Sequence, residues 1–250
     1  MLLLALDTAT PAVTVALHDG TDVIASSSQV DARRHGELLL PAVDRVLAEA
    51  GKRLDAVTGI VVGIGPGPYT GLRVGLMTAD TFGLALGVPV HGLCTLDGLA
   101  YAADIEKGPF VVATDARRKE VYWARYADSR TRLTDPAVDR PADIADEVAG
   151  LPAVGAGALL YPDTVPRAHE PEHVSAAALA ALAAEKLAAG VHLTGRGDDV
   201  AAVVQRDGDG WGGGIQSEQE HANSLRLPRP AHGRTGRPVT SCYGRDSVRT

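Results

Sequence analysis

The sequence has few of the residues that mark secreted, membrane-spanning or metal-binding proteins. Its 250 residues include only two cysteines, and Cys94 and Cys242 match no zinc-binding or redox spacing. The longest apolar run at the start, residues 1–6, is too short to cross a bilayer, and no basic start followed by a longer apolar stretch marks a secretory signal. We therefore expect a cytoplasmic protein that holds no metal and does not contact a membrane.

Aromatic residues are also scarce, at 4% of the chain, so its core must be built from Val, Leu and Ala. The formal net charge is −7, and residues 1–195 carry 24 Asp and Glu against 16 Lys and Arg. Such an acidic body is a poor stand-alone binder of nucleic acid, because phosphate contacts need clustered cations. The one dense basic cluster, Arg117-Arg118-Lys119, is either a solvated hairpin or a contact to RNA or to an acidic partner.

The order of predicted elements repeats itself once along the chain. A buried strand over residues 2–6 ends at Asp7, and a hairpin, two helices (36–50 and 70–86) and a strand (60–64) accompany it. A second apolar strand over residues 110–115 ends at Asp115 and is again followed by a returning strand and helices. This order predicts an α/β protein with the duplicated ribonuclease H-like fold of actin, sugar kinases and Hsp70-type ATPases. We expect two subdomains, residues 1–105 and 106–195.

Residues 196–250 form a segment of different composition. Within it, residues 205–250 hold only five Val, Ile or Leu residues, which cannot bury enough apolar area to offset the entropy of ordering the chain. We predict that this segment is disordered. It is either a flexible functional tail or an evolutionary accident such as a shifted reading frame.

The predicted helix 70–87 carries a stripe of small residues. Each glycine inside a helix costs about 1 kcal/mol relative to alanine, so the stripe indicates that another element approaches closely. The rest of the helix is apolar around most of its circumference, and a helix that is apolar all round must be buried all round. Either helix 36–50 covers it or another protein chain does, and we favour the second alternative. The small residues are Gly71, Gly75, Ala79, Gly83 and Gly87.

Two turns are candidate contacts for a nucleotide or another anion. The glycine-rich loop 65–71 precedes a helix N-terminus, where backbone N–H groups can hold an anion, but it lacks the Gly-Lys-Ser/Thr ending of a Walker A loop. The turn after Asp7 contains Ala9 and Pro11 where ATPases of this fold class need glycine. We therefore expect no independent ATP hydrolysis and assign no catalytic residue and no metal ligand. The remaining candidates for anion contact are Asp7, Thr8, Gly67 and Thr70.

Four segments resemble the bacterial TsaB (YeaZ) family in order and spacing over residues 1–195. They are LALDTAT (4–10), HGELLLP (35–41), GPGPYTGLRVG (65–75) and DARRKEVY (115–122). The resemblance implies a dimerising and activating subunit of the complex that places threonylcarbamoyl on the adenosine beside the tRNA anticodon. The catalytic work would belong to a paralogue, TsaD, which carries a metal-binding His pair that this chain does not have around His35.

The resemblance also implies partners and a docking surface. The family pairs with TsaD through the helices that correspond to residues 36–50 and 70–87, and a TsaE-type ATPase docks on the pair. ATP or ADP and a metal are expected in the assembled complex, tRNA would be bound through that complex, and a homodimer is expected without TsaD. The alternatives are a self-sufficient kinase or ATPase of the same fold, or a glycoprotease-like peptidase. The predicted interface residues are Leu39, Val43, Leu47, Gly71, Leu72, Gly75, Ala79 and Gly83.

Overall fold

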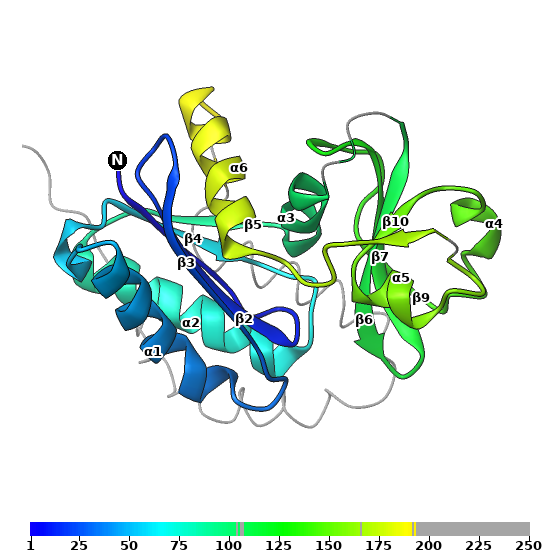
Figure 1. The fold of residues 1–250 in the computed structure, drawn as a ribbon, viewed down its shortest axis with the longest axis horizontal. Helices are drawn as coiled ribbons and strands as arrows, with labels where there is room; N and C mark the ends of the chain where they lie inside the picture. Colours follow the sequence, from blue (N-terminus) through cyan, green and yellow to red (C-terminus); the bar gives the residue numbers. More distant parts are fainter. Residues whose placement is uncertain (104, 106–107, 166, 192, 194–250) are drawn as a thin grey trace, which may run out of the picture. The chain divides into compact units, whose positions relative to one another are not determined.

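The structure is a computed structural model that describes residues 1–103, 105, 108–165, 167–191 and 193. The predicted tail, residues 196–250, lies outside the described residues. Within them the chain forms two sheets, and each sheet has at its centre an apolar strand that carries an aspartate at or near its end (Figure 1). These strands are β1 (Leu3–Asp7) and β6 (Phe110–Arg117).

The first sheet has the strand order β3-β2-β1-β4-β5. Its strands β1, β2 (Ala12–His18) and β4 (Gly59–Gly63) are buried at every residue, which explains their nearly continuous apolar sequences. The edge strand β3 (Val23–Val30) alternates between exposed and covered residues and carries three serines. The pairs β1–β2 and β2–β3 are antiparallel, whereas β1–β4 and the pairing of β4 with β5 (Val90–Leu93) are parallel.

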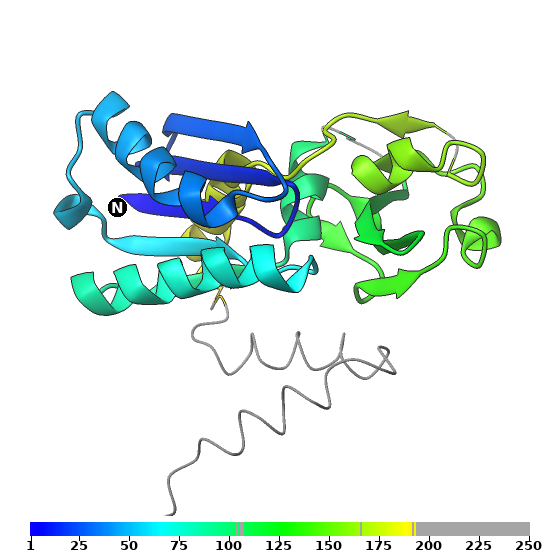
Figure 2. The ribbon, with the colours of Figure 1, turned by 90° about the horizontal axis from the view of Figure 1, so that it is seen from below.

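Helices cover both faces of the first sheet. The helices α1 (His35–Glu49) and α2 (Tyr69–Leu86) lie side by side on one face, and α6 (Ala176–Ala188) lies on the other (Figures 1 and 2). Ser175 caps the start of α6, because its side chain accepts a hydrogen bond from the Ala177 N–H. A short 3-10 turn, η1 (Leu54–Ala56), precedes β4.

The second sheet has the order β11-β10-β6-β7-β8, and β9 pairs with β7. The hairpin of β6 and β7 (Glu120–Asp128) is its longest pairing. A turn closed by the hydrogen bond from the Asp143 N–H to the Arg140 carbonyl precedes the short helix α4. The remaining elements are β8 (Thr131–Arg132), β9 (Ala137–Asp139), α4 (Ala145–Val148), β10 (Ala153–Val154), α5 (Ala156–Leu160) and β11 (Ala168–His169).

One hydrophobic core joins the two sheets through α3 (Thr95–Ala102) and α6. It contains Leu3 of the first sheet, Phe110 of the second and Leu179 of α6, and the rings of Phe110 and Tyr126 stack with centroids 5.4 Å apart. The subdomain boundary at residue 105 therefore stays a prediction, since the core runs across it. No helix in the described ranges is both long and apolar enough to span a bilayer.

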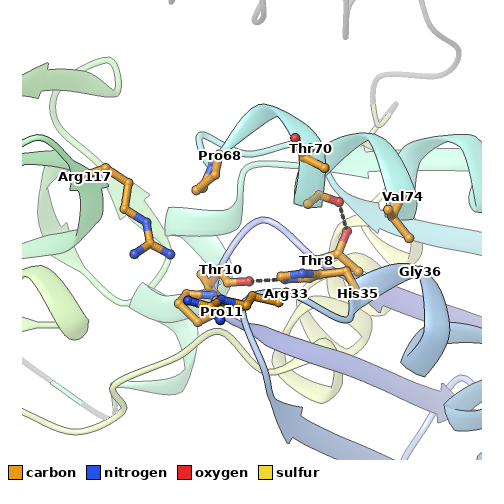
Figure 3. A pocket seen from close by; sticks show the side chains of 12 residues that line it. Thr8, Thr10, Pro11, Arg33, His35, Gly36, Pro68, Thr70, Val74 and Arg117 are labelled. Atoms are coloured by element: carbon orange, nitrogen blue, oxygen red, sulfur yellow. Dashed lines mark hydrogen bonds between the residues drawn. The ribbon is translucent and has the colours of Figure 1, made fainter.

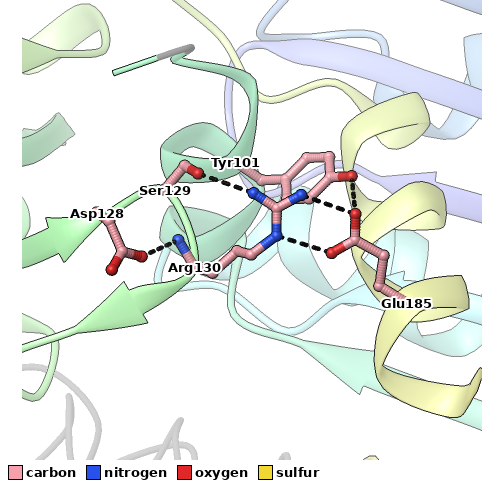
Figure 4. Close-up of polar contacts among 5 residues, drawn as sticks. All are labelled: Tyr101, Asp128, Ser129, Arg130 and Glu185. Atoms are coloured by element: carbon pink, nitrogen blue, oxygen red, sulfur yellow. Dashed lines mark hydrogen bonds and ion pairs between the residues drawn. The ribbon is translucent and has the colours of Figure 1, made fainter. Parts of the chain in front are cut away.

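A polar cluster closes the edge of this core (Figure 4). Arg130, in the turn between β7 and β8, donates two hydrogen bonds of 2.8 Å to the Glu185 carboxylate of α6. The guanidinium also lies 4.9 Å from the ring centroid of Tyr101, whose hydroxyl donates to the same carboxylate at 2.7 Å. Hydrogen bonding to Arg130 lowers the pKa of Glu185 to about 2. The cluster ties α3 and α6 to the second sheet.

Candidate functional site

Asp7, at the end of β1, is completely buried. Its Oδ1 accepts a hydrogen bond of 2.8 Å from the Ala9 N–H, and its Oδ2 accepts one of 2.8 Å from the Thr95 hydroxyl. Burial raises the pKa of Asp7 to about 6 although both hydrogen bonds lower it. Both carboxylate oxygens accept a hydrogen bond inside the chain, and contact of Asp7 with a nucleotide stays a prediction.

Thr8 is buried as well, and its hydroxyl is built into α2. The Oγ1 atom donates to the Gly71 carbonyl at 2.7 Å and accepts from the Gly75 N–H at 2.9 Å. In a regular helix these two backbone groups bond to each other, so the hydroxyl lies between the two partners of one helical hydrogen bond. A Cβ added at Gly75 would lie 2.6 Å from this oxygen. The first turn of α2 therefore packs directly against the turn after β1.

The glycine-rich loop has the same structural role. A Cβ at Gly67 would overlap the carbonyl oxygen of Ala9, and one at Gly71 would lie 2.7 Å from the carbonyl oxygen of Thr8. Gly65 has a left-handed backbone (φ +86°), and its N–H donates to the Thr95 hydroxyl at 3.1 Å. The glycines of this loop are thus required by contacts within the chain. Gly67 is buried against Ala9, and its contact with an anion stays a prediction.

The small-residue stripe of α2 also packs inside the chain. Ala79 is fully buried, and a Cβ at Gly83 would overlap the side chain of Val90 on β5. The close approach predicted from the stripe is real, but the approaching elements are the turn after β1 and strand β5, not a second protein. The predicted interface residues stay a prediction, and all eight are buried within this chain: Leu39, Val43, Leu47, Gly71, Leu72, Gly75, Ala79 and Gly83.

The opposite side of α2 is open to solvent and carries apolar side chains. Tyr69, Met77 and Leu84 are 53%, 58% and 81% exposed. Arg73 lies between them in the helix, with its guanidinium carbon 5.1 Å from the centroid of the Tyr69 ring. Their spacing of four, four and seven residues places them along one side of the helix. We call Tyr69, Arg73, Met77 and Leu84 the α2 outer face.

A cavity of about 140 Å³ lies where α1 and α2 begin (Figure 3). Its lining includes Thr8 and Thr70, but neither Asp7 nor Gly67. The Nε2–H of buried His35 donates to the Thr10 carbonyl at 2.8 Å, which fixes the ring in the wall. Two cations from different sheets' segments line the cavity, Arg33 before α1 and Arg117 at the end of β6.

The turn that carries Arg117 has an unusual backbone. Arg117, Arg118 and Lys119 have φ angles of +65°, +51° and +66°, a left-handed conformation that normally favours glycine or asparagine. The Arg117 N–H donates to Asp115 Oδ1 at 2.8 Å, which begins the turn. All three side chains are exposed. Of the two predicted alternatives for this cluster, the hairpin is present, and the structure adds a backbone conformation that the residue types do not favour.

Comparisons of sequence and of structure identify known proteins that are similar to this chain. The family model described as "TsaD: tRNA N6-adenosine threonylcarbamoyltransferase" matches residues 23–208, which is more than half of the chain. TsaB of Escherichia coli is 38% identical over 129 residues, covering 50% of this chain and 55% of that protein. The structure of YeaZ from Pseudomonas aeruginosa superposes with a TM-score of 0.66 at 34% identity, covering 76% of this chain and 93% of that one.

The chain belongs to the TsaB (YeaZ) family. An uncharacterised protein of Mycobacterium leprae is 48% identical over 159 residues, covering 60% of this chain and 43% of that protein. The chain thus spans about half the length of these curated relatives. The two sheets and the match to YeaZ confirm the duplicated ribonuclease H-like fold. In the described residues no three His, Cys, Asp or Glu side chains are grouped so that they could hold a metal ion.

Proposed function

We propose that this TsaB-family chain is a non-catalytic, activating subunit of the complex that makes threonylcarbamoyladenosine beside the tRNA anticodon. A paralogue of the TsaD type would transfer the threonylcarbamoyl group. Family membership supports the pathway, since TsaB of Escherichia coli is named a tRNA threonylcarbamoyladenosine biosynthesis protein. The observation that carries the pairing is the α2 outer face, which places three apolar side chains in solvent on one side of a single helix.

The occupant proposed for this face is the TsaD paralogue. Scattered apolar residues on a protein surface are ordinary, but a row of three large ones on one helix is typical of a surface that another helix covers. Arg73, held over the Tyr69 ring, adds an aromatic–cation contact of the kind enriched at protein interfaces. The buried glycines beneath the row have an indirect role, because they set how α2 lies on the sheet.

Three arrangements favour an accessory role over self-sufficient ATP hydrolysis. The carboxylate of Asp7 is buried and bonded to Thr95 and Ala9. Two positions of the following turn offer no N–H group to a phosphate, since Pro11 has none and the Ala9 N–H is bonded to Asp7. The Gly67 backbone packs against Ala9. ATP or ADP and a metal would be bound in the assembled complex, where a TsaE-type ATPase would dock.

Size-exclusion chromatography with light scattering tests the pairing. The full chain is mixed with the TsaD paralogue of the same organism, and the native chain is compared with Met77→Glu and Leu84→Glu. We expect the native chain to co-elute as a heterodimer and both variants to elute apart from the paralogue. Leu160→Glu on α5 is the matched control, because Leu160 is 56% exposed and lies outside the α2 outer face. Co-elution of Met77→Glu and Leu84→Glu with native affinity would reject the α2 outer face.

The same experiment without the paralogue reports on self-association. We expect the native chain alone to form a homodimer through the α2 outer face, which dissociates when the paralogue is added. A phosphate-release assay on the isolated chain addresses the alternative of a self-sufficient ATPase. Release of phosphate from ATP that is lost in Asp7→Asn would support that alternative.

A further inference from the structure

The basic turn, defined as Arg117, Arg118 and Lys119, combines two features that are separately unfavourable. Three consecutive residues adopt left-handed backbone angles, where side chains with a Cβ are strained and glycine is the usual choice. The three side chains are cationic and adjacent, so they also repel one another, although Asp115 Oδ2 lies 3.7 Å from Arg117 Nε and offsets part of one charge. The turn requires the left-handed angles but not the long cationic side chains, because glycine or asparagine would make the same turn without strain. The shape of the turn therefore does not explain why these three residues are cationic.

A further cation, from the segment before α1, lies at the cavity that Arg117 lines. Arg33, in the loop before α1, lines the cavity that Arg117 also lines (Figure 3). The N-termini of α1 and α2 border this cavity through Gly36 and Thr70, and neither helix has a side chain that caps its first turn. Uncapped helix N-termini add partial positive charge. Together these groups make a positive surface on a chain whose net charge is −7.

The size of the cavity indicates which kind of anion suits this surface. Pockets for small organic ligands usually measure about 300–1,000 Å³. The cavity here is about 140 Å³, enough for a phosphate group but small for a whole nucleotide. The basic turn itself is fully on the outside. An extended chain of phosphates that places one group at the cavity and others along the turn matches this arrangement better than a single enclosed ligand.

We propose that the basic turn and Arg33 contact the phosphate backbone of the tRNA substrate in the assembled complex. The inference rests on the proposed function, which supplies the tRNA. The contact is independent of sequence, because arginine and lysine bind phosphates through charge. It is a binding contribution rather than a catalytic one, since the groups named hold no reacting atom.

The test measures the binding of a fluorescently labelled tRNA transcript to the reconstituted pair of this chain and its TsaD paralogue, by fluorescence anisotropy at several salt concentrations. Lys119→Gly removes one charge and also removes the backbone strain, so a loss of binding cannot come from a damaged hairpin. Arg33→Gln removes a charge from the other segment. Lys52→Gln is the matched control, because Lys52 is exposed at the far end of α1. All variants keep the full chain, so the eight arginines of residues 196–250 contribute equally.

We expect Lys119→Gly and Arg33→Gln each to weaken tRNA binding about 3- to 10-fold near physiological salt, and to lower the slope of log affinity against log salt by about 0.7–0.9. The KM for tRNA in the modification reaction should rise while kcat stays unchanged. Lys52→Gln should behave as the native chain.

Three outcomes overturn the inference. The first is an unchanged affinity and salt slope for both variants in a pair that still forms and still modifies tRNA. The second is a loss of binding to the TsaD paralogue in the variants, which would assign the turn to a protein contact. The third is competition by ATP at concentrations that saturate a nucleotide site, which would assign the turn to a small ligand. If the native pair neither forms nor modifies tRNA, the proposed function fails instead.

Discussion

The hydroxyl of Thr8 stands between the Gly71 carbonyl and the Gly75 N–H of α2. It bonds to both, at 2.7 Å and 2.9 Å, and so joins the turn after β1 to the helix. Gly71 and Gly75 follow Thr8 in the sequence by 63 and 67 residues. This contact sets where α2 lies on the sheet, and hence which of its sides faces solvent.

A double-mutant cycle tests this relationship. Gly75→Ala in the native chain places a methyl group 2.6 Å from Thr8 Oγ1, and we expect a loss of about 1–3 kcal/mol in the free energy of unfolding from overpacking. Thr8→Ala should also cost about 1–3 kcal/mol, because two buried backbone groups lose their partner. The double variant should be more stable than the sum predicts by about 1–2 kcal/mol, since the nearest remaining atom, the Thr8 Cβ, is 3.6 Å away. If the two losses in the free energy of unfolding, measured with urea, were strictly additive, the result would contradict this contact between Thr8 and Gly75.

Asp7 gives the chain a specific pH dependence. Its pKa is about 6 in the folded chain against an ordinary value of 3.8, so the folded state binds the proton more tightly and stability falls as pH rises from about 4 to about 6. Ionising this buried carboxyl costs about 3 kcal/mol. We expect Asp7→Asn to gain stability relative to the native chain over this pH range, up to about that amount, when unfolding is measured at closely spaced pH values.

A second variant separates this effect from general acid unfolding. Thr95→Val removes the hydroxyl that donates to the Asp7 carboxylate and therefore raises the pKa of Asp7 further. In the Thr95→Val background the loss of stability relative to Asp7→Asn should begin at the same pH, near 4, but continue to a higher pH. A difference between native chain and Asp7→Asn that is constant with pH would show that Asp7 does not titrate in this range.

The cluster of Arg130, Glu185 and Tyr101 should stabilise the joint between α6 and the second sheet. We expect Glu185→Gln to lower the free energy of unfolding by about 1 kcal/mol at pH 7, a modest value because the ion pair is about half exposed. The pKa of Glu185 is lowered to about 2, so this contribution is complete above pH 4.5 and is lost as pH falls toward 2. Arg130→Lys keeps the charge but loses the two-bond geometry, and should retain only part of it. No change in either variant at pH 7 would leave the cluster without a stabilising role.

Much of the fold follows from the sequence because its central strands are apolar over most of their length. Residues 2–6 and 110–115 indicate buried strands directly, and both carry an aspartate at or near the end. Ser175 indicates the start of α6 by its capping chemistry. By contrast, β5 and α3 were not predicted. Strand β5 has only four residues, including a glycine, and α3 is two turns long, so neither gives a clear periodicity.

The site was harder to predict than the fold. The glycine stripe of α2 indicates close approach correctly, but spacing alone does not say whether Thr8, Val90 or another protein approaches. Met77 and Leu84 are as apolar as the buried side of the same helix, so composition did not distinguish the exposed side. The left-handed backbone of Arg117 and Lys119 gave no signal either, because neither residue type favours it. Distances between segments far apart in sequence decided each of these points.

The most direct test of the proposed role is the incorporation of labelled threonine into tRNA by a reconstituted system of this chain, the proposed TsaD-type and TsaE-type partners, ATP, and a source of the activated threonylcarbamoyl group. We predict full activity with the native chain and with Leu160→Glu, and activity near that of the reaction without this chain for Met77→Glu. Equal activity with and without the native chain, or full activity of Met77→Glu, would contradict an activating subunit that pairs through the α2 outer face.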